Sequence, residues 1–153
     1  MGDPVPLYSV GVGPWGIAID ASGNVWVTNS GSNNVTELNS SGTTIGTFTV
    51  GKFPEGIAID SSGNVWVTGA LYGGYFLSSS SEYGILTELS PTGTIIGTDF
   101  VGYNTPPGIA IDPAGNIWVT NSLSNTVTEI FGIATGPQYF PYTGPVFPGG
   151  GNL

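Results

Sequence analysis

One segment of sequence occurs three times in the 153-residue chain and decides its fold. It reads PWGIAIDASGNVWVT at 14–28, PEGIAIDSSGNVWVT at 54–68 and PPGIAIDPAGNIWVT at 106–120. The shared glycines, Gly16, Gly56 and Gly108, are separated by 40 and then 52 residues. Such close self-similarity at a period of about 40 residues indicates a repeat protein.

Each copy predicts short β-strands joined by turns. Gly-Ile-Ala-Ile-Asp is a first strand, and Asp-x-x-Gly-Asn is a turn in which Asp caps backbone N–H groups while Gly takes a positive φ. The second strand, Asn-Val-Trp-Val-Thr, is apolar on both faces, so its sheet is buried on both sides. Third strands are expected at 35–38, 86–89 and 127–130, and fourth strands at 44–50 and 94–101. Four strands in about 40 residues form the blade of a β-propeller, which makes the expected fold class all-β.

An insertion interrupts the second copy only. Thr28 to Thr36 spans 8 positions, whereas Thr68 to Thr87 spans 19, so 11 residues are added within 69–85. The added segment places aromatic side chains on a Gly- and Ser-rich background, a composition that suits recognition surfaces. The alternative is a hairpin extension that packs over its own blade or reinforces a contact between chains. The aromatic residues of the insertion are Tyr72, Tyr75, Phe76 and Tyr83.

The two ends of the chain predict one shared blade. LYSVGVGP at 7–14 aligns with TFTVGKFP at 47–54, so residues 1–13 predict the outer strand of a blade whose other strands are absent. The third copy has the opposite defect, because no fourth strand is recognisable after Ile130. The expected units are blade 1 at 14–53, blade 2 at 54–105, blade 3 without its outer strand at 106–132, and a tail rich in Pro, Gly and aromatic residues at 133–153.

Three blades are too few for a closed ring, since closed propellers have four to eight. We therefore expect a homodimer in which two chains associate head to tail into a six-bladed ring. Each N-terminal strand would complete the third blade of the partner by strand exchange and remove a free sheet edge. The alternative is that the chain is a fragment of a longer propeller.

The repeated pattern P-x-G-I-A-I-D-x-x-G-N-V-W-V-T-N, followed by N-x-V-T-E-L, resembles the NHL repeat over about residues 5–132. Within the NHL-repeat β-propellers it is similar to the branch of streptogramin lyase-like and gluconolactonase-like proteins. The resemblance implies the propeller fold but leaves the function open, because such propellers serve as enzymes, ligand binders and scaffolds. It implies that lyase chemistry would use a His base with a divalent metal, and lactonase-like chemistry carboxylates and Asn around a metal.

Composition excludes several classes of function. Ten Asp and Glu residues stand against one basic residue, Lys52, and the net charge is −9, so a binding surface for nucleic acid or anionic membranes is missing. The chain has no His and no Cys, which removes the imidazole base, the thiol nucleophile and the usual zinc ligands. The N-terminus has neither the basic nor the apolar region of a signal peptide. The polar, Lys-poor composition nevertheless favours an exported or extracellular bacterial protein.

Most acidic and Trp residues occupy repeated positions, which favours structural roles. We expect turn capping by the Asp set, solvated or cross-strand positions for the Glu set and packing between blades for the Trp set. Trp15 is the unrepeated Trp, at a rim of the central channel, and Asn29 and Asn121 follow the second strand where the second copy has Gly69. The repeated sets are Asp20, Asp60 and Asp112; Glu37, Glu88 and Glu129; and Trp26, Trp66 and Trp118.

The sequence thus predicts a non-catalytic binding or structural module that assembles with itself. No catalytic residue, metal ligand or cofactor is expected, and the expected partners are a second copy of the chain and a protein or small polar ligand. The alternative is a lyase or lactonase-like propeller enzyme with a carboxylate and Asn metal site. The candidates for ligand or partner contact are Trp15, Asn29, Tyr72, Tyr75, Phe76, Tyr83 and Asn121.

Overall fold

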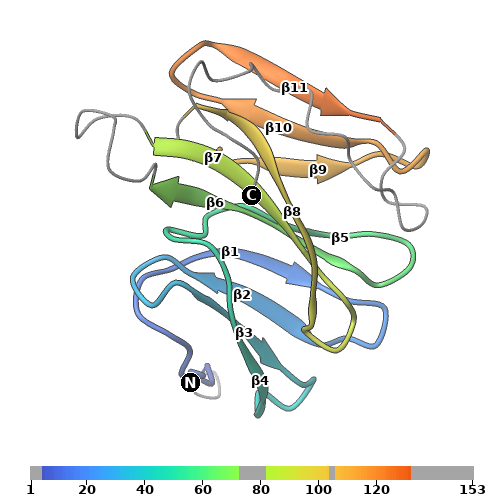
Figure 1. Cartoon of the computed structure of the whole chain (residues 1–153). Coiled ribbons are helices and arrows are strands. Elements are labelled where there is room, and N and C mark those ends of the chain that lie inside the picture. Colours follow the sequence, from blue (N-terminus) through green and yellow to red (C-terminus); the bar gives the residue numbers. More distant parts are fainter. Residues whose placement is uncertain (1–4, 73–81, 104–105, 132–153) are drawn as a thin grey trace.

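The computed structural model describes residues 5–72, 82–103 and 106–131, and all regular structure in these ranges is β-strand (Figure 1). These ranges contain no helix that could cross a membrane. The expected all-β fold class is confirmed. The first sheet contains β1 (Pro14–Ile19), β2 (Val25–Asn29), β3 (Asn34–Leu38) and β4 (Thr44–Thr49); the second contains β5 (Ile57–Ile59), β6 (Val65–Tyr72), β7 (Glu82–Leu89) and β8 (Ile95–Tyr103); and the third contains β9 (Ile109–Ile111), β10 (Ile117–Asn121) and β11 (Thr126–Ile130).

Each repeat forms one antiparallel sheet, and the three sheets are stacked in sequence order (Figure 1). Within a sheet the strands follow one another as they do in the chain, so each blade is a simple meander. The first strands of the blades, β1, β5 and β9, lie next to one another. This is the arrangement of the innermost strands of a propeller. In the described residues the third sheet has three strands, with β11 at its edge.

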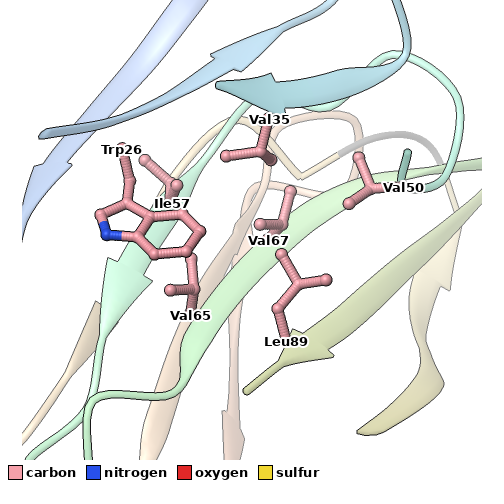
Figure 2. Packing of buried hydrophobic residues seen from close by; sticks show 7 residues of the cluster. All are labelled: Trp26, Val35, Val50, Ile57, Val65, Val67 and Leu89. Atoms are coloured by element: carbon pink, nitrogen blue, oxygen red, sulfur yellow. The ribbon is translucent and has the colours of Figure 1, made fainter. Parts of the chain in front are cut away.

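The hydrophobic core lies between the sheets. Trp26 and Val35 of the first sheet pack on a face of the second sheet formed by Ile57, Val65 and Leu89 (Figure 2). Trp66 and its neighbours on the other face of the second sheet pack in the same way on Ile117 and Val119 of the third sheet. The Trp face of each blade therefore covers the Val and Ile face of the next blade, which confirms the packing role predicted for Trp26 and Trp66.

Within the described part of the chain, two faces at the ends of the stack are exposed. Trp118 is 38% exposed, whereas its repeat equivalents Trp26 and Trp66 are 1% and 2% exposed. Ile17 is 67% exposed, whereas Ile57 is 8% exposed. We call the first surface, with Trp118 and Val127, the open Trp face, and the second, with Ile17 and Ile19, the open Ile face. Each consists of positions whose repeat equivalents are covered by an adjacent blade.

The insertion of the second repeat lengthens one hairpin. Strands β6 and β7 have 8 residues each, whereas β2 and β3 have 5. The added pairs run from Ala70↔Gly84 to Tyr72↔Glu82, since Gly69↔Ile85 corresponds to Asn29↔Asn34. The hairpin extension considered for this segment is therefore present at its base, and the tip of the insertion lies outside the described residues.

Replacing Leu86 by Ala should destabilise the chain by about 2–5 kcal/mol, because its side chain is 1% exposed and fills the space between the second and third sheets. Urea unfolding at a fixed protein concentration measures the effect. Ile96→Ala is the control, since Ile96 lies half exposed on β8 in the same sheet, and it should change stability by about 0.5 kcal/mol or less. Equal losses in both variants would contradict the assignment of the core.

Candidate functional site

The turn between the first two strands has the same hydrogen bonding in all three blades. In the second blade, Oδ1 of Asp60 accepts hydrogen bonds from the backbone N–H groups of Ser62 and Asn64 at 2.8 and 2.9 Å. The backbone of Gly63 donates to the carbonyl oxygen of Asp60, with a φ of 85° that glycine adopts without strain. Asp20 and Asp112 make the equivalent bonds. The predicted capping role of the Asp set is confirmed.

The second oxygen of the same carboxylate binds the core tryptophan. Oδ2 of Asp60 accepts a hydrogen bond from the indole Nε1 of Trp66 at 3.0 Å. The corresponding distances are 3.2 Å for Asp20 and Trp26, and 3.2 Å for Asp112 and Trp118. One carboxylate therefore closes the turn and holds the indole. Sequence reasoning missed this bond, although a constant separation of six residues between Asp and Trp was the signal for it.

The repeated Glu residues lie directly opposite the core tryptophans. Glu37 pairs with Trp26 and Glu88 with Trp66 on neighbouring strands. Glu37 is buried rather than solvated, and its Oε1 accepts a hydrogen bond at 3.1 Å from Nδ2 of Asn24, which also donates to Asp20. The cross-strand interpretation of the Glu set is thus correct, whereas solvation is wrong for Glu37.

The pKa values of Glu37 and Glu88 are raised and that of Asp20 is lowered, each from a different balance of causes. Burial, and then the charge of Asp20, raises the pKa of Glu37. Burial and the charge of Asp60 raise the pKa of Glu88 in the same way. Burial also pushes the pKa of Asp20 upward, but hydrogen bonds from Asn24, Trp26 and Ser22 outweigh it and hold that pKa below its usual value. The resulting carboxylate pairs contain two acids each, and no group of three or more His, Cys, Asp or Glu residues that could hold a metal occurs within 5–72, 82–103 and 106–131.

The two candidate asparagines end equivalent strands but differ in accessibility. Asn29 is fully buried, and its Nδ2 donates to Oδ1 of Asn34 at 2.8 Å and to Oγ1 of Thr36 at 2.9 Å. Gly11 lies directly on this side chain, since a Cβ there would come within 2.7 Å of the Asn29 Cγ. The Oδ1 atom of Asn29 is buried without a hydrogen-bond partner. In this conformation Asn29 stabilises the end of the β2–β3 hairpin and no ligand can reach it.

Asn121 lines a shallow pocket at the edge of the third sheet. Its Nδ2 donates to Oγ1 of Thr126 at 3.2 Å and to Oγ1 of Thr128 at 2.8 Å. The pocket holds about 330 Å³ between β8 and the β10–β11 hairpin, and its walls are amide, hydroxyl and aliphatic groups. A second pocket of about 270 Å³ lies between the turns that follow β5 and β9, beside Asp60 and Asp112. Both pockets are small and uncharged apart from these two turn-capping aspartates.

Two further candidates, Trp15 and Tyr83, lie in different blades. Trp15 is the second residue of β1, is mostly exposed, and belongs with Ile17 and Ile19 to the exposed residues of that strand. It lies next to the open Ile face, across an irregularity in the strand pairing between Pro14 and Ile17. Tyr83 lies on β7 and packs edge-to-face on Phe100, with ring centroids 5.6 Å apart.

The remaining candidates belong to the insertion. Tyr72 ends β6, and Tyr75 and Phe76 lie outside the described residues. The β2–β3, β6–β7 and β10–β11 hairpins all lie at one rim of the stack, which we call the hairpin rim (Figure 1). The structure thus places Trp15, Asn29, Tyr83 and Asn121 at one rim but in different blades, so they form no single described site.

Residues 12–38 match the family model of the NHL repeat. The chain carries an NHL repeat. The matched stretch contains β1, the Asp20 turn, β2 and β3, which are the elements that recur in the other two blades. The resemblance read from the sequence is confirmed for the repeat. No curated relative matches the sequence.

Solved structures place the NHL-repeat chain among the β-propellers. It is similar to a hydrazine synthase structure from Kuenenia stuttgartiensis, with a TM-score of 0.58 and 22% identity over 78% of this chain and 32% of that one. It is also similar to virginiamycin B lyase from Staphylococcus aureus, with a TM-score of 0.52 and 20% identity over 77% of this chain and 41% of that one. At these low identities the structural similarity establishes the fold alone. The chain spans about a third and two fifths of the lengths of these two proteins.

Asp60→Asn should destabilise the chain by about 1–3 kcal/mol, because the amide cannot accept a hydrogen bond at Nδ2 and leaves the buried indole N–H of Trp66 unpaired. Urea unfolding of a double-mutant cycle with Trp66→Phe isolates this bond. In the Phe background, which has no N–H to satisfy, the cost of Asp60→Asn should fall clearly. An unchanged cost would show that the turn bonds alone account for the effect.

Glu88→Gln should stabilise the chain at neutral pH, with the gain disappearing as the pH falls toward the ordinary Glu pKa of 4.5. The raised pKa means that the folded state binds the proton more tightly than the unfolded state, so stability decreases as pH rises through that raised pKa. Gln cannot ionise and therefore removes this decrease in stability. Thermal unfolding of both chains between pH 4 and pH 8 measures the difference in stability.

Asp112→Asn is the contrasting variant for this pH series. Hydrogen bonds from the backbone of Asn116 and from Trp118, which outweigh desolvation, lower the pKa of Asp112. Its carboxylate therefore stabilises the fold above the unfolded-state pKa and loses this effect as the pH falls. The variant should be destabilised at neutral pH and approach the wild type in acid. The same sign for both variants would contradict the assigned electrostatics.

Proposed function

We propose that this NHL-repeat chain is a non-catalytic binding module that assembles with a second copy into a closed ring of six blades. The observation that carries the proposal is the contrast between equivalent repeat positions. Trp118 is 38% exposed and Ile17 is 67% exposed, whereas Trp26 and Ile57 are almost completely buried where two blades meet. The same side chains that form the core between blades thus form the two free faces.

The open Trp face and the open Ile face are complementary. Each already has its counterpart inside the chain, since the Trp26 face covers the face that contains Ile57. A second copy could therefore place its Trp118 against Ile17 with the side-chain types that the internal interfaces use. Two chains give six blades, within the usual range of four to eight, whereas one chain gives three and three chains give nine. A head-to-tail contact that closes after two copies has cyclic symmetry.

A hydrogen bond between blades supports the same arrangement. The Oγ1 of Thr28 donates to the backbone carbonyl of Glu55 in the next blade at 2.8 Å, and that of Thr68 donates to the carbonyl of Pro106 at 2.6 Å. Thr120 is the equivalent residue of the third blade, and its Oγ1 accepts from the backbone of Gly108 as in the other copies. A fourth blade would supply the missing carbonyl at the segment that precedes its first strand.

The hairpin rim is the proposed binding surface. It carries the lengthened β6–β7 hairpin and the pocket beside Asn121, and a twofold ring presents both features twice on the same side. The proposed ligand is a protein or a small polar molecule. The non-catalytic role is supported by the lack of His and Cys in the sequence and by the engagement of both oxygens of Asp20, Asp60 and Asp112 in structural hydrogen bonds.

Light scattering after size-exclusion chromatography tests the assembly. The wild-type chain should have twice the 15.6 kDa mass of one copy. Ile17→Lys should give a folded monomer, because it places a charge in the interface, whereas Ile96→Lys should remain a dimer because Ile96 lies on neither open face. A monodisperse wild-type monomer would sink the proposal. Lyase or lactonase activity that depends on added divalent metal would overturn its non-catalytic part.

A further inference from the structure

The N-terminal segment, residues 5–13, lies where the outer strand of a preceding blade would lie. The ring of Tyr8 packs directly on Gly42, in the turn between β3 and β4, so that a Cβ at this glycine would overlap it. The ring of Phe48, on the outer strand β4, packs in the same way on Gly93, in the turn between β7 and β8. Gly42 and Gly93 have φ values of 79° and 80°. Tyr8 therefore has the same position relative to the first blade as Phe48 has relative to the second blade.

Two further contacts of residues 5–13 with the first blade resemble contacts that an outer strand makes with the blade after it. Gly11 lies on Asn29 of the first blade, as Gly102 of the outer strand β8 lies on Asn121 of the third. The backbone of Gly31 donates to the carbonyl of Val12 at 2.9 Å, close to the place where Ala70 and Lys52 exchange backbone hydrogen bonds one blade further on. Two contacts in one register, and a backbone bond one residue away from it, place the segment one blade ahead of β1.

Such an outer strand needs a sheet with an unpaired third strand, and the third sheet has one in β11 among the described residues. In the first sheet, β4 pairs with β3, with Phe48 opposite Val35 and its ring stacked on Trp26 at a centroid distance of 5.4 Å. In the third sheet, β11 is an edge among the described residues, and the side chains of Trp118 and Val127 are exposed. Asp112 nevertheless holds the indole of Trp118 in the same way as in the other blades.

We infer that residues 7–9 of each copy form the outer strand of the third sheet of the other copy, with Tyr8 stacked on Trp118. The inference rests on the proposed ring and specifies how it closes. The repeat offsets of 40 residues for β4 and 92 residues for β3 fix the register: Tyr8 lies opposite Val127, Ser9 opposite Thr126 and Leu7 opposite Thr128. Pro6 is compatible with this place, because the strand is outermost and leaves one side unpaired.

A disulfide between copies tests the register, because the chain contains no Cys. The equivalent of Ser9 and Thr126 in the first sheet is the pair Thr49 and Asn34. The neighbouring bond from Val50 N to Asn33 O makes this a non-hydrogen-bonded pair, whose close Cα atoms suit a disulfide. Oxidised Ser9→Cys/Thr126→Cys should give a covalent dimer on a non-reducing denaturing gel, which returns to one copy on reduction.

Matched variants separate the exchanged strand from random collisions. Ser9→Cys/Ser124→Cys is two residues out of register, and Ser9→Cys alone has no partner in the strand pair; both should cross-link much more slowly. A wild-type dimer without preferential cross-linking of Ser9 and Thr126 would overturn the strand exchange and leave the proposed ring standing. A disulfide within one copy, or a ladder of covalent multimers, would overturn the closed exchange. A monomeric wild type would overturn the proposed ring itself.

Tyr8 provides a second test through the dimer dissociation constant. Tyr8→Phe keeps a ring at the position where the first blade has Phe48, so it should dissociate on dilution like the wild type. Tyr8→Ala removes both Tyr8–Trp118 stacks from the dimer and should raise the dissociation constant more than about tenfold. Circular dichroism confirms that both variants fold. Equal constants for Tyr8→Ala and Tyr8→Phe would overturn the stack on Trp118.

Discussion

The hydrogen bonds of one repeated carboxylate fix the position of each blade relative to the next. Asp60 closes the turn that reverses the chain after β5 and, through its second oxygen, orients the indole of Trp66. That indole then packs against the following sheet. A change at the turn would thus be transmitted to the contact between blades, because the same side chain belongs to both. Few charged residues are needed elsewhere, which agrees with a chain that contains one Lys and no Arg or His.

Packing between sheets, more than within them, determines which residues are buried. The third blade has the equivalents of β1, β2 and β3 and the same Asp and Trp bond as the other two, yet its Trp face is exposed. A four-stranded meander has two apolar faces and buries neither by itself. Nearest-neighbour packing of this kind makes the stability of repeat proteins a sum of repeat and interface contributions. The covering of one face by an adjacent blade is therefore the main stabilising contribution.

The sequence predicted the strands, the Asp turns, the insertion and the propeller blade, because each follows from local periodicity or from comparison of the three copies. Its account of individual side chains was less complete. The burial of Glu37 and Asn29 depends on contacts with Trp26 and Gly11 that no local pattern records. Strand and turn propensities also did not predict the hydrogen bond between the Trp26 indole and Asp20, although the six-residue spacing of Asp and Trp recurs in every repeat. Trp15 was assigned to the channel rim, and its exposure on the same strand as Ile17 became apparent only from the folded chain.

The place of the N-terminal segment also bears on how such chains evolve. Residues 5–13 lie one blade ahead of β1 and make contacts there that β4 and β8 repeat. Tandem duplication of the gene would therefore join the end of one copy to a segment that is already in the position of an outer strand. The proposed interface between two chains would then become an interface within one chain, with the same residues in the same register. Single-chain propellers with more blades are accessible from this repeat without the invention of a new contact surface.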